Sequence, residues 1–92
     1  MIIRILGQGQ YEVASSLFDT LNAIDNKIVE CVQNGNVKEY NKNFAELTDL
    51  ILKEGKKIPD TELVGSSVMV PPTDLTFEEA RQIFRGDGIF KG

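Results

Sequence analysis

The fold is decided at residues 28–44, which read IVECVQNGNVKEYNKNF. Gly35 suits the left-handed backbone position just past the end of a helix, and Asn36 is a favourable N-cap for the next helix. On both sides of this turn, apolar residues recur at alternating spacings of three and four, which is typical of amphipathic helices. The pattern predicts helices over 15–34 and 37–54, joined by a turn so short that they must pack antiparallel as a helical hairpin.

Each predicted helix carries one apolar stripe and leaves its polar residues on the other faces. We expect Ser15 or Ser16 to cap the first helix, and Asp25 to lie outside its stripe. Cys31 falls within the stripe, where cysteine usually behaves as a small hydrophobe. The residues expected to be buried together are Leu21, Ile24, Ile28, Phe44, Leu47 and Ile51.

The segment before the helical hairpin predicts two strands. Residues 1–13 alternate between two faces, and the run Gly7-Gln8-Gly9 favours a tight hairpin turn. The same run invites a phosphate-loop interpretation, but Glu12 stands where a dinucleotide fingerprint has its third glycine. Because a two-stranded hairpin is marginal in water, we expect it to lie against the helices.

The segment after the helical hairpin is less regular. Residues 67–70 are a candidate third strand, ended by two prolines, because proline cannot donate to a strand ladder. Thr76 and Glu79 form a capping box, which predicts a short third helix over 77–85. The chain is therefore predicted to be a single α+β domain over residues 1–92.

Composition narrows the classes of function. The 92 residues include no histidine and one cysteine, which excludes or strongly disfavours histidine-based catalysis, zinc fingers and an internal disulfide. The formal net charge of −4 disfavours non-specific binding to nucleic acid or to anionic lipid. No apolar run approaches the roughly 18 residues of a membrane span, and the N-terminus lacks a signal-peptide layout, so we expect a cytoplasmic protein.

No set of catalytic, cofactor-binding or metal-binding residues can be assembled from the sequence. The adjacent Glu78 and Glu79 point in different directions on a helix, so they do not form an acid–base pair. Cys31 has no histidine to activate it as a nucleophile. The candidate anchors for a protein partner are apolar residues expected to be left over once the core is filled: Tyr11, Leu50, Leu52 and Phe90.

Two runs of sequence carry a resemblance to a known family. The first is MIIRILGQGQYEV at 1–13, and the second is Val-Pro-Pro-x-Asp at 70–74. With the helical hairpin between them and a short helix after them, these runs resemble the PspA-associated PspAA family over essentially the whole chain. Gln8 departs from the family, which often carries an acid at that place in the turn.

The resemblance implies a small, non-enzymatic accessory protein of the phage-shock envelope-stress response. The implied partner is PspA, a coiled-coil phage shock protein that binds stressed membranes. Contact with the inner membrane face would then be peripheral and made through PspA. The family offers no catalytic residues, cofactor or metal that could be transferred to this chain.

Two other classes of function stay open at this point. A small-ligand sensor or an enzyme of unknown chemistry would need a polar pocket, and a DNA-binding regulator would need a basic helix face. We also expect a homodimer, because the N-terminal hairpin has unpaired edges that only Arg4 and Glu12 protect.

Overall fold

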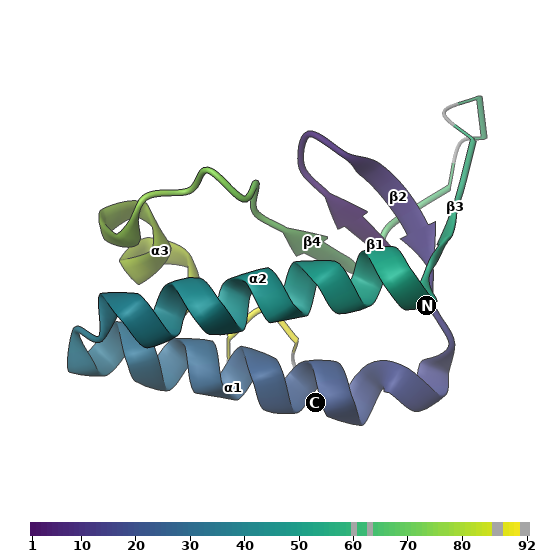
Figure 1. The fold of residues 1–92 in the computed structure, drawn as a ribbon. Helices are drawn as coiled ribbons and strands as arrows, with labels where there is room; N and C mark the ends of the chain where they lie inside the picture. Colours follow the sequence, from purple (N-terminus) through teal and green to yellow (C-terminus); the bar gives the residue numbers. More distant parts are fainter. Residues whose placement is uncertain (60, 63, 86–87, 91–92) are drawn as a thin grey trace.

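Three helices and a four-stranded mixed sheet form the described part of the chain (Figure 1). The computed structural model describes residues 1–59, 61–62, 64–85 and 88–90. This architecture confirms the predicted α+β class. The elements follow in the order β1 (Ile2–Ile5), β2 (Gly9–Glu12), the 3-10 turn η1 (Ser15–Leu17), α1 (Phe18–Asn34), α2 (Val37–Glu54), β3 (Lys56–Lys57), β4 (Val68–Val70) and α3 (Phe77–Ile83).

The turn at Gly35 separates the two long helices, as predicted. Gly35 adopts a left-handed φ of 72°, and its amide donates to the carbonyl of Val32. The Asn36 side chain accepts a hydrogen bond of 3.2 Å from the amide of Glu39, so Asn36 is the N-cap of α2. As a result, α1 and α2 lie side by side and run in opposite directions (Figure 1).

The start of α1 differs from the prediction that Ser15 or Ser16 caps it. Ser15–Leu17 form a 3-10 turn, and Leu17 occupies the cap position without a side-chain hydrogen bond. Both serines precede the cap position, so their hydroxyls do not serve the free amides of the helix. Asp19 still places a carboxylate in the first turn, where the helix dipole favours negative charge.

The sheet has the strand order β3-β2-β1-β4. β1 and β2 form the predicted antiparallel hairpin, and Gly7 and Gly9 supply the positive φ angles of a hairpin turn. β4 adds to β1 in parallel with Ile3 opposite Val68, which confirms the predicted third strand. The sequence does not predict β3, because Lys56–Lys57 has no apolar alternation and is defined only by its pairing with β2.

These pairings remove the open hairpin edges on which the expectation of a homodimer rested. β4 covers one side of the N-terminal hairpin and β3 covers the other, so the hairpin edges are paired within the chain. The expectation that those edges are open is therefore wrong. The free edges of the described sheet are those of β3 and β4.

The core lies between the sheet and the helical hairpin. Ile3 and Ile5 of β1 have no exposed surface, and they belong to the same buried cluster as all six helix residues that we expected to be buried together. α3 lies near the turn of the helical hairpin (Figure 1). The contacts between them are aromatic. The ring centroid of Tyr40 lies 5.4 Å from that of Phe77 and 6.3 Å from that of Phe84.

Asp25 is buried, contrary to the expectation that it lies outside the apolar stripe. Its carboxylate has no exposed surface and accepts hydrogen bonds from the amides of Ile89 (3.2 Å) and Phe90 (2.8 Å). Burial raises the pKa of this carboxyl, and the two amide hydrogen bonds only partly oppose the shift. Asp25 thus holds a segment that lies 64 and 65 positions further along the chain.

The C-terminal segment 88–90 packs closely against α1. Gly88 adopts a φ of 78°, and a Cβ at this position would overlap the Asp25 carboxylate. Phe90 is fully buried and makes an edge-to-face contact with Phe18, with 6.3 Å between the ring centroids. Both the backbone conformation and the close approach therefore require glycine at position 88.

The stability of the fold should depend on Ile28, which has no exposed surface. We predict that Ile28→Ala lowers the free energy of unfolding by about 2–5 kcal/mol, because it removes buried methyl groups and leaves a cavity. Leu52→Ala is the matched control, since Leu52 is 37% exposed, and it should cost less than about 1 kcal/mol. Urea unfolding followed by circular dichroism measures both values, and equal effects would contradict the assignment of the core.

Asp25 should make the stability of the chain depend on pH. Because its pKa is raised in the folded state, its stabilising contribution is complete below the unfolded value of 3.8 and is lost as the pH rises through the folded value. We predict that the free energy of unfolding of the wild type, measured relative to Asp25→Asn, increases as the pH falls from about 7 to about 4. A decrease over that range would mean that the two amide hydrogen bonds outweigh the cost of burial.

Candidate functional site

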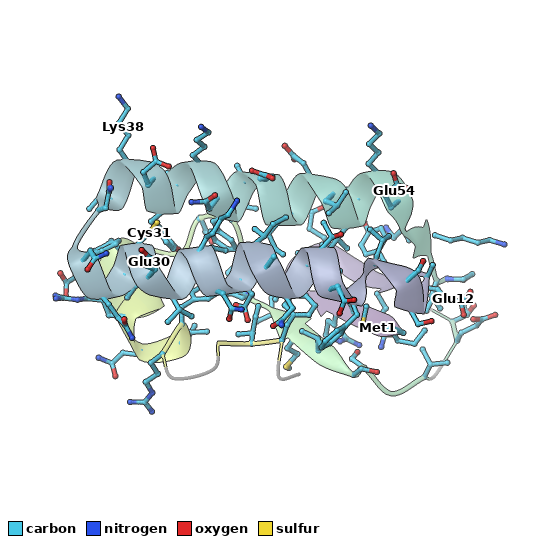
Figure 2. The ribbon with its side chains drawn as sticks, turned by 90° about the horizontal axis from the view of Figure 1, so that it is seen from below. Met1, Glu12, Glu30, Cys31, Lys38 and Glu54 are labelled. Atoms are coloured by element: carbon cyan, nitrogen blue, oxygen red, sulfur yellow. The ribbon has the colours of Figure 1, made fainter. Side chains whose placement is uncertain are left out.

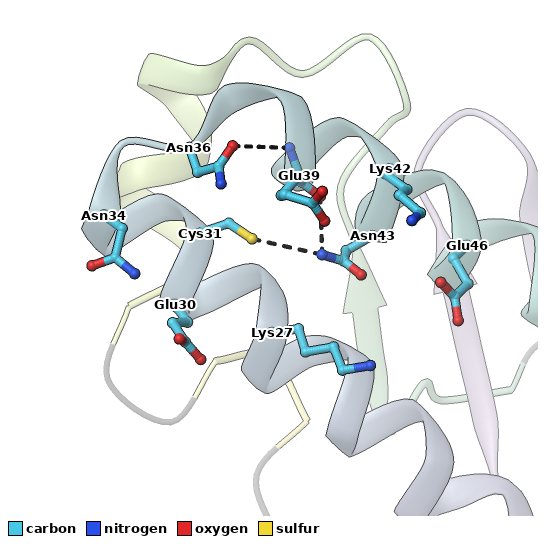
Figure 3. Close-up of a pocket in the computed structure, with 9 residues that line it drawn as sticks. All are labelled: Lys27, Glu30, Cys31, Asn34, Asn36, Glu39, Lys42, Asn43 and Glu46. Carbon is cyan, nitrogen blue, oxygen red and sulfur yellow. Dashed lines mark hydrogen bonds between the residues drawn. The ribbon is translucent and has the colours of Figure 1, made fainter.

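A groove runs between α1 and α2 on the face of the helical hairpin opposite the sheet. Near the turn it forms a hollow of about 410 Å³, whose nine lining residues are labelled in Figure 3. Figure 2 shows Cys31 between the two helices and Glu30 beside it on α1. The sheet and α3 leave this side of the helical hairpin open, so its side chains are free to meet a partner.

A polar contact joins the two helices within the groove. The Asn43 amide donates to the Cys31 Sγ at 3.6 Å and to the carbonyl of Glu39 at 2.9 Å (Figure 3). Asn43 is buried and Cys31 is half-buried, so the thiol lies at the margin of the core and not within it. Because a thiol sulfur is a weak acceptor, the contact orients Asn43 and does not activate a nucleophile.

The sides of the groove carry charges of both signs. Glu39, Lys42 and Glu46 follow one another along α2 at spacings of three and four, which places them on the same side of the helix. Lys27 and Glu30 line the facing side on α1. In the described part of the chain, none of these five side chains forms an ion pair within 4 Å. Their charges are therefore available to a partner.

The groove continues along α2 into a second hollow of about 470 Å³. The second hollow shares Lys42 and Glu46 with the first, so the two are continuous. It adds Leu50, a half-buried residue that packs against the core. We name the combined surface the outer hairpin face; it comprises the residues labelled in Figure 3 together with Ala45, Asp49, Leu50 and Lys53.

The four predicted partner anchors do not form one patch. Leu50 lies on the outer hairpin face, whereas Leu52 follows two positions later and therefore points about 200° further around α2. Tyr11 is 7% exposed and Phe90 has no exposed surface, so the expectation that they are exposed is wrong. Tyr11 alternates onto the buried face of β2, and Asp25 holds the backbone of Phe90 against α1.

The described residues do not assemble a metal centre, because no three histidine, cysteine or acidic side chains among them are close enough to share an ion. No helix in that part of the chain is long and apolar enough to cross a membrane. Hydrogen bonds from the amide and hydroxyl of Thr76 lower the pKa of Glu79, and burial raises the pKa of Tyr40 to about 12. Both shifts arise from contacts within the fold, away from the outer hairpin face.

The fold and this surface together define a class of protein, a small α+β module with a long helical hairpin and a polar outer face. The family model for the PspA-associated protein (PspAA) matches residues 1–92. The chain therefore belongs to the PspA-associated protein family, which confirms the resemblance seen in its sequence. Comparisons with curated proteins and with solved structures gave no match.

The contact between Asn43 and Cys31 should contribute to the stability of the groove. We predict that Asn43→Ala lowers the free energy of unfolding by about 1–2 kcal/mol more than Asn41→Ala, because only Asn43 is buried with two hydrogen-bond partners. The two substitutions change helix propensity equally, so their difference isolates the contact. Chemical denaturation measures the free energy of unfolding of both variants. Equal values would show that the contact does not contribute to stability.

Proposed function

We propose that this chain is a non-enzymatic accessory protein of the phage-shock envelope-stress response and that it binds PspA directly. The observation that carries the proposal is the match of the PspA-associated family model to residues 1–92. A binding role also suits the outer hairpin face. Its described residues offer charged, amide and apolar side chains for recognition but no paired nucleophile and base.

The outer hairpin face is the surface that we assign to PspA. If PspA is a coiled-coil protein, as the resemblance implies, one of its helices can lie lengthwise in the groove between two antiparallel helices. α1 and α2 contain 17 and 18 residues, which correspond to about 25 Å at 1.5 Å per residue. This length matches several turns of a partner helix.

Charge and apolar surface have separate roles in this proposed contact. Leu50 supplies an apolar anchor in the second hollow, and Lys42 and Glu46 form part of a polar rim that fixes orientation. Tyr11 and Phe90 are buried in the core, so we do not assign them to this contact. Leu52 lies on the other flank of α2 and would be reached only by a partner that wraps around that helix.

We place the protein in the cytoplasm, with contact to the inner membrane face made through PspA. A net charge of −4 would be repelled by anionic headgroups, which supports an indirect membrane contact. We also propose that two copies of the chain associate as a homodimer.

Titration of purified PspA with this protein tests the proposed contact. We predict that the wild type binds with a Kd in the range of tens of micromolar or below, and that Lys42→Glu and Glu46→Lys each change that Kd by at least about fivefold, because both charges border the groove. Glu62→Lys is the matched control, since Glu62 is exposed on a loop outside the helical hairpin. It should leave the Kd unchanged.

Isothermal titration calorimetry at two salt concentrations provides the measurement. Absence of wild-type binding to PspA in its lipid-binding state would end the direct-partner proposal. Binding that neither Lys42→Glu nor Glu46→Lys alters would keep the partner and show that the outer hairpin face is the wrong surface.

A further inference from the structure

We infer that Asn43 selects the helix that binds the outer hairpin face and sets its direction. The partner helix carries a hydrogen-bond donor opposite Asn43 and an apolar residue about two helical turns away, opposite Leu50. This inference rests on the proposed contact with PspA. It adds which helix sequence fits the groove and which way that helix lies.

The groove residues of α2 have the spacing of a coiled coil. They form two rows in which residues recur at intervals of seven: Asn36, Asn43 and Leu50 in one row, and Glu39, Glu46 and Lys53 in the other. Seven residues are close to two turns of an α-helix, with a rise of about 10.5 Å. A partner helix that lies along α2 therefore meets the same row again after each heptad of its own sequence.

The Oδ1 atom of Asn43 is a hydrogen-bond acceptor that is open to the groove. The Nδ2 of the same amide donates to the Cys31 Sγ and to the carbonyl of Glu39, and these two bonds fix the orientation of the amide. None of the described residues donates to Oδ1, which points away from Cys31 (Figure 3). Among the described residues, the buried side-chain oxygens without a partner are those of Tyr40 and Thr48, so Oδ1 is not enclosed.

A helix that covers the groove removes this oxygen from water. If the partner helix places an apolar side chain there, the oxygen loses its hydrogen bond and binding is weakened; a donor at the same place restores the bond. A single buried asparagine fixes the register of coiled coils in the same way. Asn43 thus discriminates between helices by what it rejects as well as by what it binds.

The two ends of the groove differ in polarity, which gives the contact a direction. The hollow near the turn is lined by charged, amide and thiol side chains, whereas Ala45 and Leu50 bring aliphatic side chains into the second hollow. The helix that fits has its donor near the turn and its apolar residue toward the other end of α2. In the reverse direction, the apolar residue would cover Asn43 and the donor would face Leu50.

Two substitutions separate this role of Asn43 from its structural role. Asn43→Leu and Asn43→Asp both remove the hydrogen bonds from Nδ2, but only the aspartate variant keeps an acceptor oxygen in the groove. We expect Asn43→Leu to raise the Kd for purified PspA at least about tenfold, and Asn43→Asp to stay within about threefold of the wild type. Asn41→Leu is the matched control, because Asn41 is exposed on α2 outside the groove, and it should leave the Kd unchanged. Circular dichroism melting verifies that every variant is folded.

Cross-linking through the native lysines measures the direction of the partner helix. Lys42 and Lys53 both line the second hollow, with Lys42 on the side of the turn. A reagent that couples to lysine at one end and is photoactivated at the other can link both residues to PspA for mapping by mass spectrometry. The wild type should link them to one PspA helix in a single order along its sequence. Asn43→Leu should give both orders, or positions displaced by a heptad.

The outcomes distinguish this inference from the proposed function. Absence of wild-type binding to PspA overturns the proposed function and this inference with it. If the wild type binds PspA, equal Kd values for the wild type and Asn43→Leu overturn this inference alone. Equal losses for Asn43→Leu and Asn43→Asp would show that Asn43 acts only on the structure of the groove. Both cross-linking orders in the wild type would overturn the assigned direction.

Discussion

The antiparallel contact between α1 and α2 is the interaction on which the other elements depend. The strands contain two to four residues each, and α3 contains seven, so none of these elements is long enough to be stable alone. They gain stability by burying apolar side chains against the helical hairpin. Gly35 and Asn36 create that hairpin because they end one helix and start the next within three residues.

The same contact determines which surface remains for a partner. The apolar stripes of both helices face the sheet, α3 and the C-terminal segment, so the charged positions are left on the outer hairpin face. Asn43 lies at the boundary, where a buried amide meets Cys31 of the other helix. The helical hairpin therefore serves both as the centre of the core and as the platform of the proposed PspA contact.

Signals that act over a few residues predicted most of the fold. Periodicity gave both long helices, the turn at Gly35 is a local stop, and the capping box at Thr76 is a local start. The features that the sequence did not predict depend on contacts between residues that are far apart in the chain. β3 exists only through its pairing with β2, and Asp25 is buried because it binds amides of the C-terminal segment. No pattern within a single helix contains that information.

The candidate site was predictable only in part for the same physical reason. A helical pattern shows which face is polar, so the exposed side of the helical hairpin and Leu50 followed from the sequence. It does not show which distant segments of the chain cover an apolar side chain. Tyr11 and Phe90 are aromatic residues near the ends of the molecule's sequence, and only the tertiary contacts reveal that both are buried.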